Sequence, residues 1–208
     1  MKKLTFTLSL LLVLLTGCSG AGKKKIELPP LEDGQTICLE NEDVRLLDHE
    51  TDNTFYIIVQ SKYKDGKSFE TPEGTIFETI MGNSLVVSQG TGNIRTLLVY
   101  NLQTGEEKAR IENFFSGIAP VPEGDSAMTF YIYNEDTAGM AWDASSEEWV
   151  LYGDLEEGMQ NSTIDEAKRS CEEHLFPGLC IVPLQKHRMD LASWIVTPLK
   201  EYHWSYSE

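Results

Sequence analysis

The chain has 208 residues, of which 41% are hydrophobic and 24% charged, so it can bury the core of one ordinary globular domain. Its 33 acidic residues outnumber its 17 basic residues, which gives a formal net charge of −16. A surface this acidic repels nucleic acid and anionic lipid, so the composition argues against a nucleic-acid partner and leaves plain solubility or a cationic partner.

The first segment of the chain has the form of a secretory signal. Lys2 and Lys3 precede an apolar run over 4–15, which is shorter than the roughly 20 residues that a membrane-spanning helix needs. The run leads into Leu15-Thr16-Gly17-Cys18, and small residues follow at 19–22. This segment resembles the lipobox of bacterial lipoprotein precursors. The alternative is an ordinary cleaved signal peptide with an incidental cysteine.

The lipobox resemblance implies that residues 1–17 are removed and that Cys18 carries a diacylglycerol group, usually with a further acyl chain on the new amino terminus. Each buried CH₂ contributes ~0.8 kcal/mol, so two or three acyl chains hold a domain on a bilayer. Ser19 resembles the outer-membrane sorting signal of Gram-negative lipoproteins, which implies an outer-membrane location in the cell envelope. Loss of the two signal-peptide lysines changes the formal charge from −16 to −18.

Residues 18–34 are predicted to comprise the lipidated cysteine and a flexible tether, because they combine small residues, three lysines and a Pro-Pro pair. Residues 35–208 are predicted to form a single, mostly β domain. Short β-branched and aromatic runs separated by Gly, Asn and Asp indicate an antiparallel meander of short strands. The clearest runs are Thr54–Val59, Ser84–Ser88, Thr96–Tyr100, Met128–Tyr133, Trp149–Tyr152 and Leu179–Leu184.

One short α-helix is predicted near 164–175. Thr163 and Glu166 have the spacing of a capping box, and Pro177 would end the helix. Its apolar residues share one face, which should turn inward. They are Ile164, Ala167, Cys171 and Leu175.

Three cysteines remain once Cys18 carries lipid, which in an oxidising compartment allows one disulfide and one spare thiol. The nearest pair, Cys171 and Cys180, would join the end of the helix to the next strand, and we expect this bridge. The alternative is two separate buried thiols. No role is assigned to Cys38, and the cysteine spacing does not fit a zinc site.

A short pattern recurs along the chain: an apolar residue, then Asp or Asn, then Ser or Thr three positions later. Its Asp and Asn side chains can cap tight turns. Spacings of 53, 42 and 47 residues between successive copies are typical of propeller blades, so propeller-like repeats compete with a sandwich or barrel of consecutive hairpins. The copies begin at Leu47-Asp48, Tyr100-Asn101, Trp142-Asp143 and Met189-Asp190, with one out of phase at Tyr133-Asn134.

Chemistry-bearing motifs do not emerge from the sequence, so no catalytic residue, metal site or cofactor is predicted. The four histidines are scattered, and the glycine-rich stretches do not open a helix. An alternating aromatic row near the C-terminus could instead stack against a sugar or a partner protein, or simply cover the core. It consists of Tyr202, Trp204 and Tyr206, with Trp194 upstream.

Together these features indicate a lipid-anchored binding or accessory module of the cell envelope, held to a membrane by its anchor. An inhibitor of a cationic enzyme such as lysozyme is one alternative, because anchor, compartment and charge would all suit a cationic envelope protein as partner. An envelope glycan-acting enzyme is another, and it would need two carboxylates about 5–10 Å apart in a groove.

Replacement of Cys18 by Ala should move the protein from the membrane fraction to the soluble fraction, because it removes the sulfur that would carry the lipid. Fractionation of cells that express each form, followed by immunoblotting, measures the shift. Firm membrane association of the variant would contradict the anchor assignment.

Overall fold

The computed structural model describes residues 24–52, 54–135 and 138–207, so the expected signal peptide and Cys18 lie outside the described residues. The fold is mostly β and antiparallel, as the sequence predicts. A first, four-stranded sheet pairs in chain order. Its strands are β1 (Gln35–Glu40), β2 (Val44–Glu50), β3 (Phe55–Ser61) and β4 (Phe69–Glu70).

A second, longer sheet has the strand order β12-β11-β13-β10-β8-β7-β6-β5, with β9 paired to β10 and β14 paired to β13. Its first half is β5 (Thr75–Met81), β6 (Ser84–Gln89), β7 (Ile94–Asn101) and β8 (Glu107–Phe115). Its second half is β9 (Val121–Glu123), β10 (Ala127–Ile132), β11 (Gly139–Asp143), β12 (Glu148–Tyr152), β13 (Cys180–Asp190) and β14 (Val196–Ser207).

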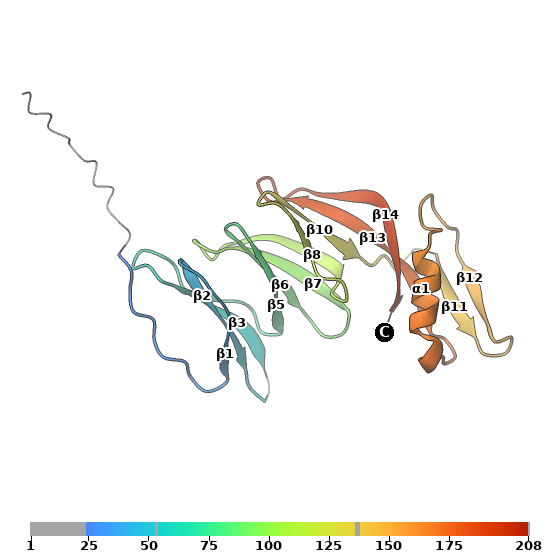
Figure 1. The fold of residues 1–208 in the computed structure, drawn as a ribbon, viewed down its shortest axis with the longest axis horizontal. Coiled ribbons are helices and arrows are strands. Elements are labelled where there is room, and N and C mark those ends of the chain that lie inside the picture. Colours follow the sequence, from blue (N-terminus) through green and yellow to red (C-terminus); the bar gives the residue numbers. More distant parts are fainter. Residues whose placement is uncertain (1–23, 53, 136–137, 208) are drawn as a thin grey trace, which may run out of the picture.

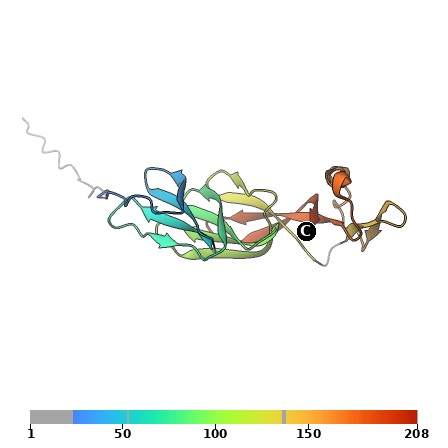
Figure 2. The ribbon, with the colours of Figure 1, turned by 90° about the horizontal axis from the view of Figure 1, so that it is seen from below.

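The molecule is elongated, and its elements follow one another along the long axis roughly in chain order (Figures 1 and 2). The first sheet lies at one end, β5–β8 lie in the middle, and β11, β12 and the helix α1 lie at the other end (Figure 1). The described strands form an open row and close no barrel.

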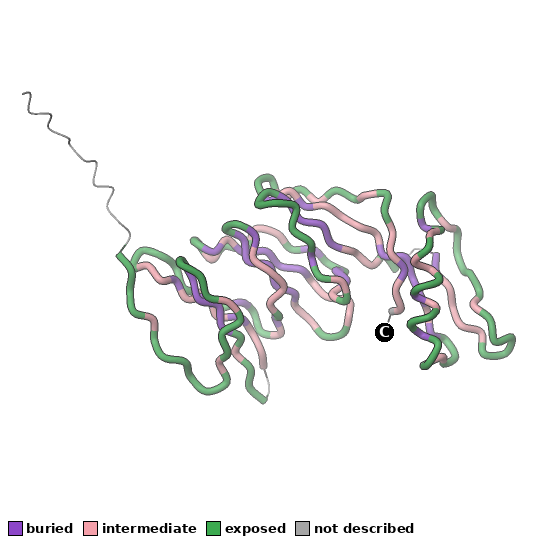
Figure 3. The backbone as a smooth tube through the Cα atoms, viewed as in Figure 1, coloured by how far each residue is buried: buried purple, intermediate pink, exposed green. Residues whose placement is uncertain are grey.

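The β6–β7 hairpin is buried on both faces. On one face, Leu85, Val87 and Leu98 pack with β2 and β3 of the first sheet. On the other, Val86 and Leu97 pack with β8, β10 and β13. Because successive side chains of a strand point to opposite faces, a strand buried on both sides has a continuous apolar run, as β6 does. Figure 3 shows the buried residues along this hairpin and on the strands to either side.

Three hairpins of the chain close with the same turn, in which an Asp or Asn side chain caps the backbone. Asn101 Oδ1 accepts from the N–H groups of residues 103 and 104 at 3.0 and 2.9 Å. Asp143 Oδ1 accepts from Ser145 N at 2.8 Å. Asp190 Oδ1 accepts from Ser193 N and Ser193 Oγ, both at 2.8 Å. The recurring sequence pattern therefore predicts these turns correctly.

Each of these turns also places its fifth residue in the left-handed region. Gly105 has φ 66°, Glu147 has φ 55° and Trp194 has φ 62°. Glycine suits this position, and a Cβ on Gly105 would also lie 2.9 Å from a ring carbon of Phe69. The two non-glycine residues adopt a costlier conformation, which the side-chain caps help to hold.

Of the two remaining copies, the one at Asp48 does not form this turn, and the one at Asn134 is not fully described. Asp48 lies within β2, and Thr137, which would complete the copy at Asn134, lies outside the described residues. Asn41 caps a turn outside the pattern, between β1 and β2. Three of the five copies thus mark hairpin ends, and the pattern does not mark blades of equal size.

The predicted helix is shorter than expected: α1 spans Thr163–Ser170, and a separate 3₁₀ turn spans Glu172–His174. No capping box forms at Thr163. Instead, Asn161 Oδ1 accepts from Thr163 N at 2.9 Å. The expected inward face is confirmed, since Ala167 and Cys171 are buried against Trp204 with Ile164 and Leu175 around them.

The capped turns predict how stability responds to acid. Hydrogen bonds from backbone and side-chain groups lower the pKa of Asp143 and of Asp190 below the ordinary value of 3.8. A carboxyl with a lowered folded-state pKa stabilises the fold above its unfolded pKa and loses that contribution as pH falls through the folded value. Stability should therefore decline from about pH 5 to about pH 2.

The double variant Asp143→Asn/Asp190→Asn keeps an acceptor oxygen in each turn but cannot titrate there. Thermal unfolding across this pH range should show a shallower acid decline for the double variant than for the natural protein. Asp33→Asn, at an exposed turn, serves as the control. Equal acid slopes for the natural protein and the double variant would contradict the assignment.

Candidate functional site

A cleft of about 350 Å³ opens where loops of the first sheet meet loops of β5–β8. Hydrogen bonds fix two of its walls, because the caps at Asn41 and Asn101 hold the β1–β2 and β7–β8 turns. Seven of its eleven lining residues have an oxygen in the side chain. They are Asn41, Asp43, Ser61, Tyr63, Asp65, Asn83 and Gln103.

Tyr63 is the aromatic group of this cleft. Burial raises the pKa of its phenol, and the negative charges of Asp43 and Glu42 raise the pKa further. A hydrogen bond between the phenol and the Asp43 carboxylate also raises the pKa, so the two cleft residues are already engaged with each other. The Lys25 ammonium lies 5.8 Å from the Tyr63 ring centroid. The lining can receive a small cationic or polyhydroxylated group.

The chain that leads to the domain is attached beside this cleft. Ile26 N donates to Lys62 O at 2.9 Å, and Lys64 N donates to Lys24 O at 3.0 Å. The expected tether of 18–34 is thus held against the first sheet from Lys24 onward.

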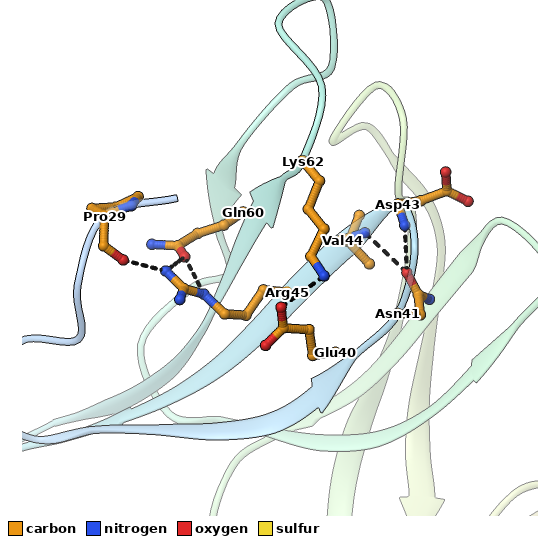
Figure 4. Close-up of polar contacts among 8 residues, drawn as sticks. All are labelled: Pro29, Glu40, Asn41, Asp43, Val44, Arg45, Gln60 and Lys62. Atoms are coloured by element: carbon orange, nitrogen blue, oxygen red, sulfur yellow. Dashed lines mark hydrogen bonds and ion pairs between the residues drawn. The ribbon is translucent and has the colours of Figure 1, made fainter. Parts of the chain in front are cut away.

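Arg45 fastens the same segment from inside the sheet (Figure 4). Only 9% of the residue is exposed, and it lies opposite Gln60 on β3. Its guanidinium donates to Gln60 Oε1 from Nε at 2.8 Å and from Nη2 at 2.5 Å, and to Pro29 O from Nη2 at 2.6 Å. We call Arg45, Gln60 and Pro29 the arginine clamp. Nearby, Lys62 pairs with Glu40 at 2.7 Å on the surface.

Arg45 belongs to none of the sequence motifs described above. A lone arginine between Val44 and Leu46, in a run that is otherwise apolar, is the signal that could have identified it. A buried guanidinium needs hydrogen-bond acceptors, so such an arginine indicates a structural contact. Asp43 and Tyr63 had no comparable signal, because only the fold brings their loops together.

The opposite end of the molecule carries an exposed edge strand. Among the described strands, β12 ends the long sheet and pairs only with β11. Three consecutive apolar residues on it are substantially exposed: Val150 by 48%, Leu151 by 46% and Tyr152 by 41%. Adjacent exposed apolar residues on the edge strand of a sheet are unusual and are typical of interaction sites.

Three residues of the predicted aromatic row, Tyr202, Trp204 and Tyr206, lie on β14 near α1. Trp204 is only 1% exposed, and its indole Nε1 donates to Met159 O at 2.6 Å. Tyr206 packs against the same cluster. Tyr202 is half-buried, and its hydroxyl donates to Glu156 Oε2 at 3.1 Å.

Trp194 lies apart from the other three, in the β13–β14 turn, where it packs against the core shared by β8, β10 and β13. The structure thus does not bring the four aromatic residues together as one exposed row. Trp204 and Tyr206 line a cavity of about 280 Å³ beside α1, but Trp204 itself is almost fully buried. Their observed contacts are those of residues that cover a core.

Cys171 and Cys180 are free thiols in the structure. Cys171 is buried beside Ile181, whereas Cys180 precedes Ile181 in β13 and therefore points to the other face of the sheet. There its Sγ lies 3.3 Å from Gly178 O. Burial raises the pKa of the nearby Tyr152 phenol, and Cys180 raises that pKa further. The bridge stays a prediction, and it would require the start of β13 to turn over. Cys38 is exposed.

Within the described ranges of the chain, no group of three or more His, Cys, Asp or Glu side chains is placed to hold a metal ion. No helix in that part of the chain is both long and apolar enough to cross a membrane. Comparison of the chain with known protein families, with curated proteins and with solved structures finds no match.

The arginine clamp predicts a local effect of mutation. Arg45→Ala removes the hydrogen bonds to Pro29 and Gln60, and hydrogen bonds from a charged group contribute roughly 1.5–3 kcal/mol. Amide exchange at Ile26 and Lys64 should therefore speed up by about tenfold or more, because 1.4 kcal/mol corresponds to a factor of ten. Exchange in β6 should change much less. Hydrogen-exchange mass spectrometry of the intact chain measures both.

The control is Lys62→Ala, which breaks a surface ion pair beside the clamp and should have a small effect. Equal acceleration by Arg45→Ala and Lys62→Ala would show that the clamp does not hold the segment.

Proposed function

We propose that the protein is a lipid-anchored binding module of the bacterial cell envelope, attached at the outer membrane through Cys18 and engaging its partner at the β12 end. The observation that carries this proposal is the exposed apolar edge of β12. A strand with free main-chain groups and apolar side chains is a ready template for another chain.

The position of β12 supports the proposal. The segment that would lead to the anchor contacts the first sheet, and β12 lies at the opposite end of the long axis (Figure 1). A chain tethered at one end and open at the other suits a module that reaches from a membrane to a partner. Acyl chains supply the attachment, so the folded part needs no lipid-binding surface of its own.

A second candidate is an envelope glycan-acting enzyme, and the cleft is what favours it. Asp43 and Asp65 both line the cleft, and a glycosidase needs two carboxylates in a groove. The variants Asp43→Asn and Asp65→Asn test this candidate directly. Turnover of an envelope glycan that either variant abolishes would establish the enzyme and set aside the binding module.

An inhibitor of a cationic enzyme such as lysozyme is a special case of the binding module. The stretch from residue 111 to residue 167 contains 13 acidic residues and no Lys, Arg or His. This stretch includes β12, so a cationic partner would find both charge and apolar surface at the same end of the molecule. Purified protein should then lower the rate of such an enzyme in a salt-sensitive way.

Photo-crosslinking in cells tests the binding module. A photoreactive amino acid at Val150, in the intact lipidated protein, should give adducts of defined size with another protein, because this side chain is exposed on the free strand. The same amino acid at Thr91, in the exposed β6–β7 turn, is the control. Adducts at Thr91 of equal yield, or none at Val150, would argue against the proposed function.

A further inference from the structure

The main chain of β12 offers a defined set of hydrogen-bonding groups at its free edge. In β11, Trp142 N donates at 2.9 Å to the carbonyl just before β13, so the neighbouring Ala141 faces β12. Ala141 lies opposite Val150, which therefore points its N–H and C=O toward β11. By the same alternation, Trp149 and Leu151 direct their N–H and C=O groups outward.

The side chains on both faces of this edge are apolar. Leu151 lies on the same face as Trp149, whose ring packs 5.7 Å from that of Trp142, centroid to centroid. Val150 and Tyr152 lie on the other face. An added strand would therefore place side chains beside apolar neighbours on both of its faces, and such cross-strand pairs stabilise a sheet.

Negative charge lies at both ends of the apolar residues 149–152 of β12. Glu147 and Glu148 precede them, Asp154 follows them, and all three are exposed. They belong to the long acidic stretch that has no basic residue of its own. An incoming strand would therefore meet attraction at each end if it carries Lys or Arg there, and repulsion if it carries Asp or Glu.

From this arrangement we propose that β12 is extended by a strand from a cationic partner: a segment with an apolar centre and basic residues on both flanks. The added strand bonds to the outward groups of Trp149 and Leu151 through its main chain. This inference rests on the proposed function, because it takes the β12 end as the binding surface and adds the chemistry of the partner.

A second copy of this chain is the obvious rival occupant, and charge disfavours it. Antiparallel pairing of two β12 strands would bring Glu147 and Glu148 of one copy near the acidic end of the other copy. Each chain carries a formal charge of −16 before any processing, so long-range repulsion also opposes the approach.

The test uses the intact mature chain in neutral detergent micelles and a labelled nine-residue peptide. The peptide alternates Val and Thr over its five central residues and has two lysines at each end. Fluorescence anisotropy should show saturable binding that weakens as salt rises. A peptide with glutamates in place of the lysines should bind at least about tenfold more weakly, or not at all.

Two substitutions at one position separate main chain from side chain. Leu151→Pro removes an outward N–H and breaks no bond to β11, so an edge strand can tolerate it. Leu151→Ala shortens the same side chain and keeps the N–H. The proline variant should weaken binding by about tenfold or more, and the alanine variant by about threefold or less. Thermal unfolding reports whether each variant is folded.

Main-chain hydrogen bonding can also be tested by changing the peptide and leaving the protein unchanged. N-methyl groups on its central residues remove the donors that strand pairing needs and should abolish binding. For charge, Glu147→Gln/Glu148→Gln should weaken binding, whereas the matched pair Glu42→Gln/Glu73→Gln, at the other end of the molecule, should not.

Undiminished binding of the N-methylated or glutamate peptide would overturn the inference, as would self-association at β12 without peptide binding. A failed peptide assay combined with crosslinks at Val150 in cells overturns strand addition and leaves the proposed function standing. Failure of both experiments overturns both.

Discussion

The β6–β7 hairpin requires cover on both of its faces, and this requirement organises the rest of the molecule. Leu85 and Val87 point to the first sheet, and Val86 points to the strands that follow. A hairpin of this kind cannot form an outer layer, since either face would expose apolar side chains to water. The chain therefore places the first sheet against one face of the hairpin and later strands of the hairpin's own sheet against the other, and the result is an open row with two distinct ends.

Different segments cover the sheet at the two ends of the row. At the first end, the arginine clamp and the segment from Lys24 cover the outside of the sheet. At the far end, α1 and the residues around Met159 cover Trp204 on one face of the sheet. β12 lies beyond this cover, so its edge stays open. The polar cleft belongs to the first end and the apolar edge to the second.

Much of the fold could be predicted from local chemistry. β-branched runs located strands, and Asp or Asn followed by Ser or Thr located turns at Asn101, Asp143 and Asp190. The helix boundary could not be predicted in this way. Glu172 and Glu173 place negative charge where a longer helix would end, which disfavours extension beyond Ser170, and the loop path lets Asn161 cap in place of Thr163.

The candidate site was mostly beyond prediction, for reasons that are particular to its residues. Asp43 and Tyr63 come together only because turns of separate hairpins meet. Because every second side chain of a strand points to the same face, the sequence placed Tyr202 and Trp204 on one face of a strand. It could not show that α1 covers that face. Nine residues of separation made Cys171 and Cys180 look like a pair, although the pleat of β13 points Cys180 away from Cys171.

We propose that Cys18 ties the chain to a bilayer and that β12 is presented away from that bilayer. Energy transfer from a fluorophore on the lipidated protein to acceptor lipids in vesicles measures this directly. The two positions to compare are Asp65, beside the tether contacts, and Glu147, beside β12. We expect clearly stronger transfer from position 65. Equal transfer from both positions, or stronger transfer from position 147, would contradict it.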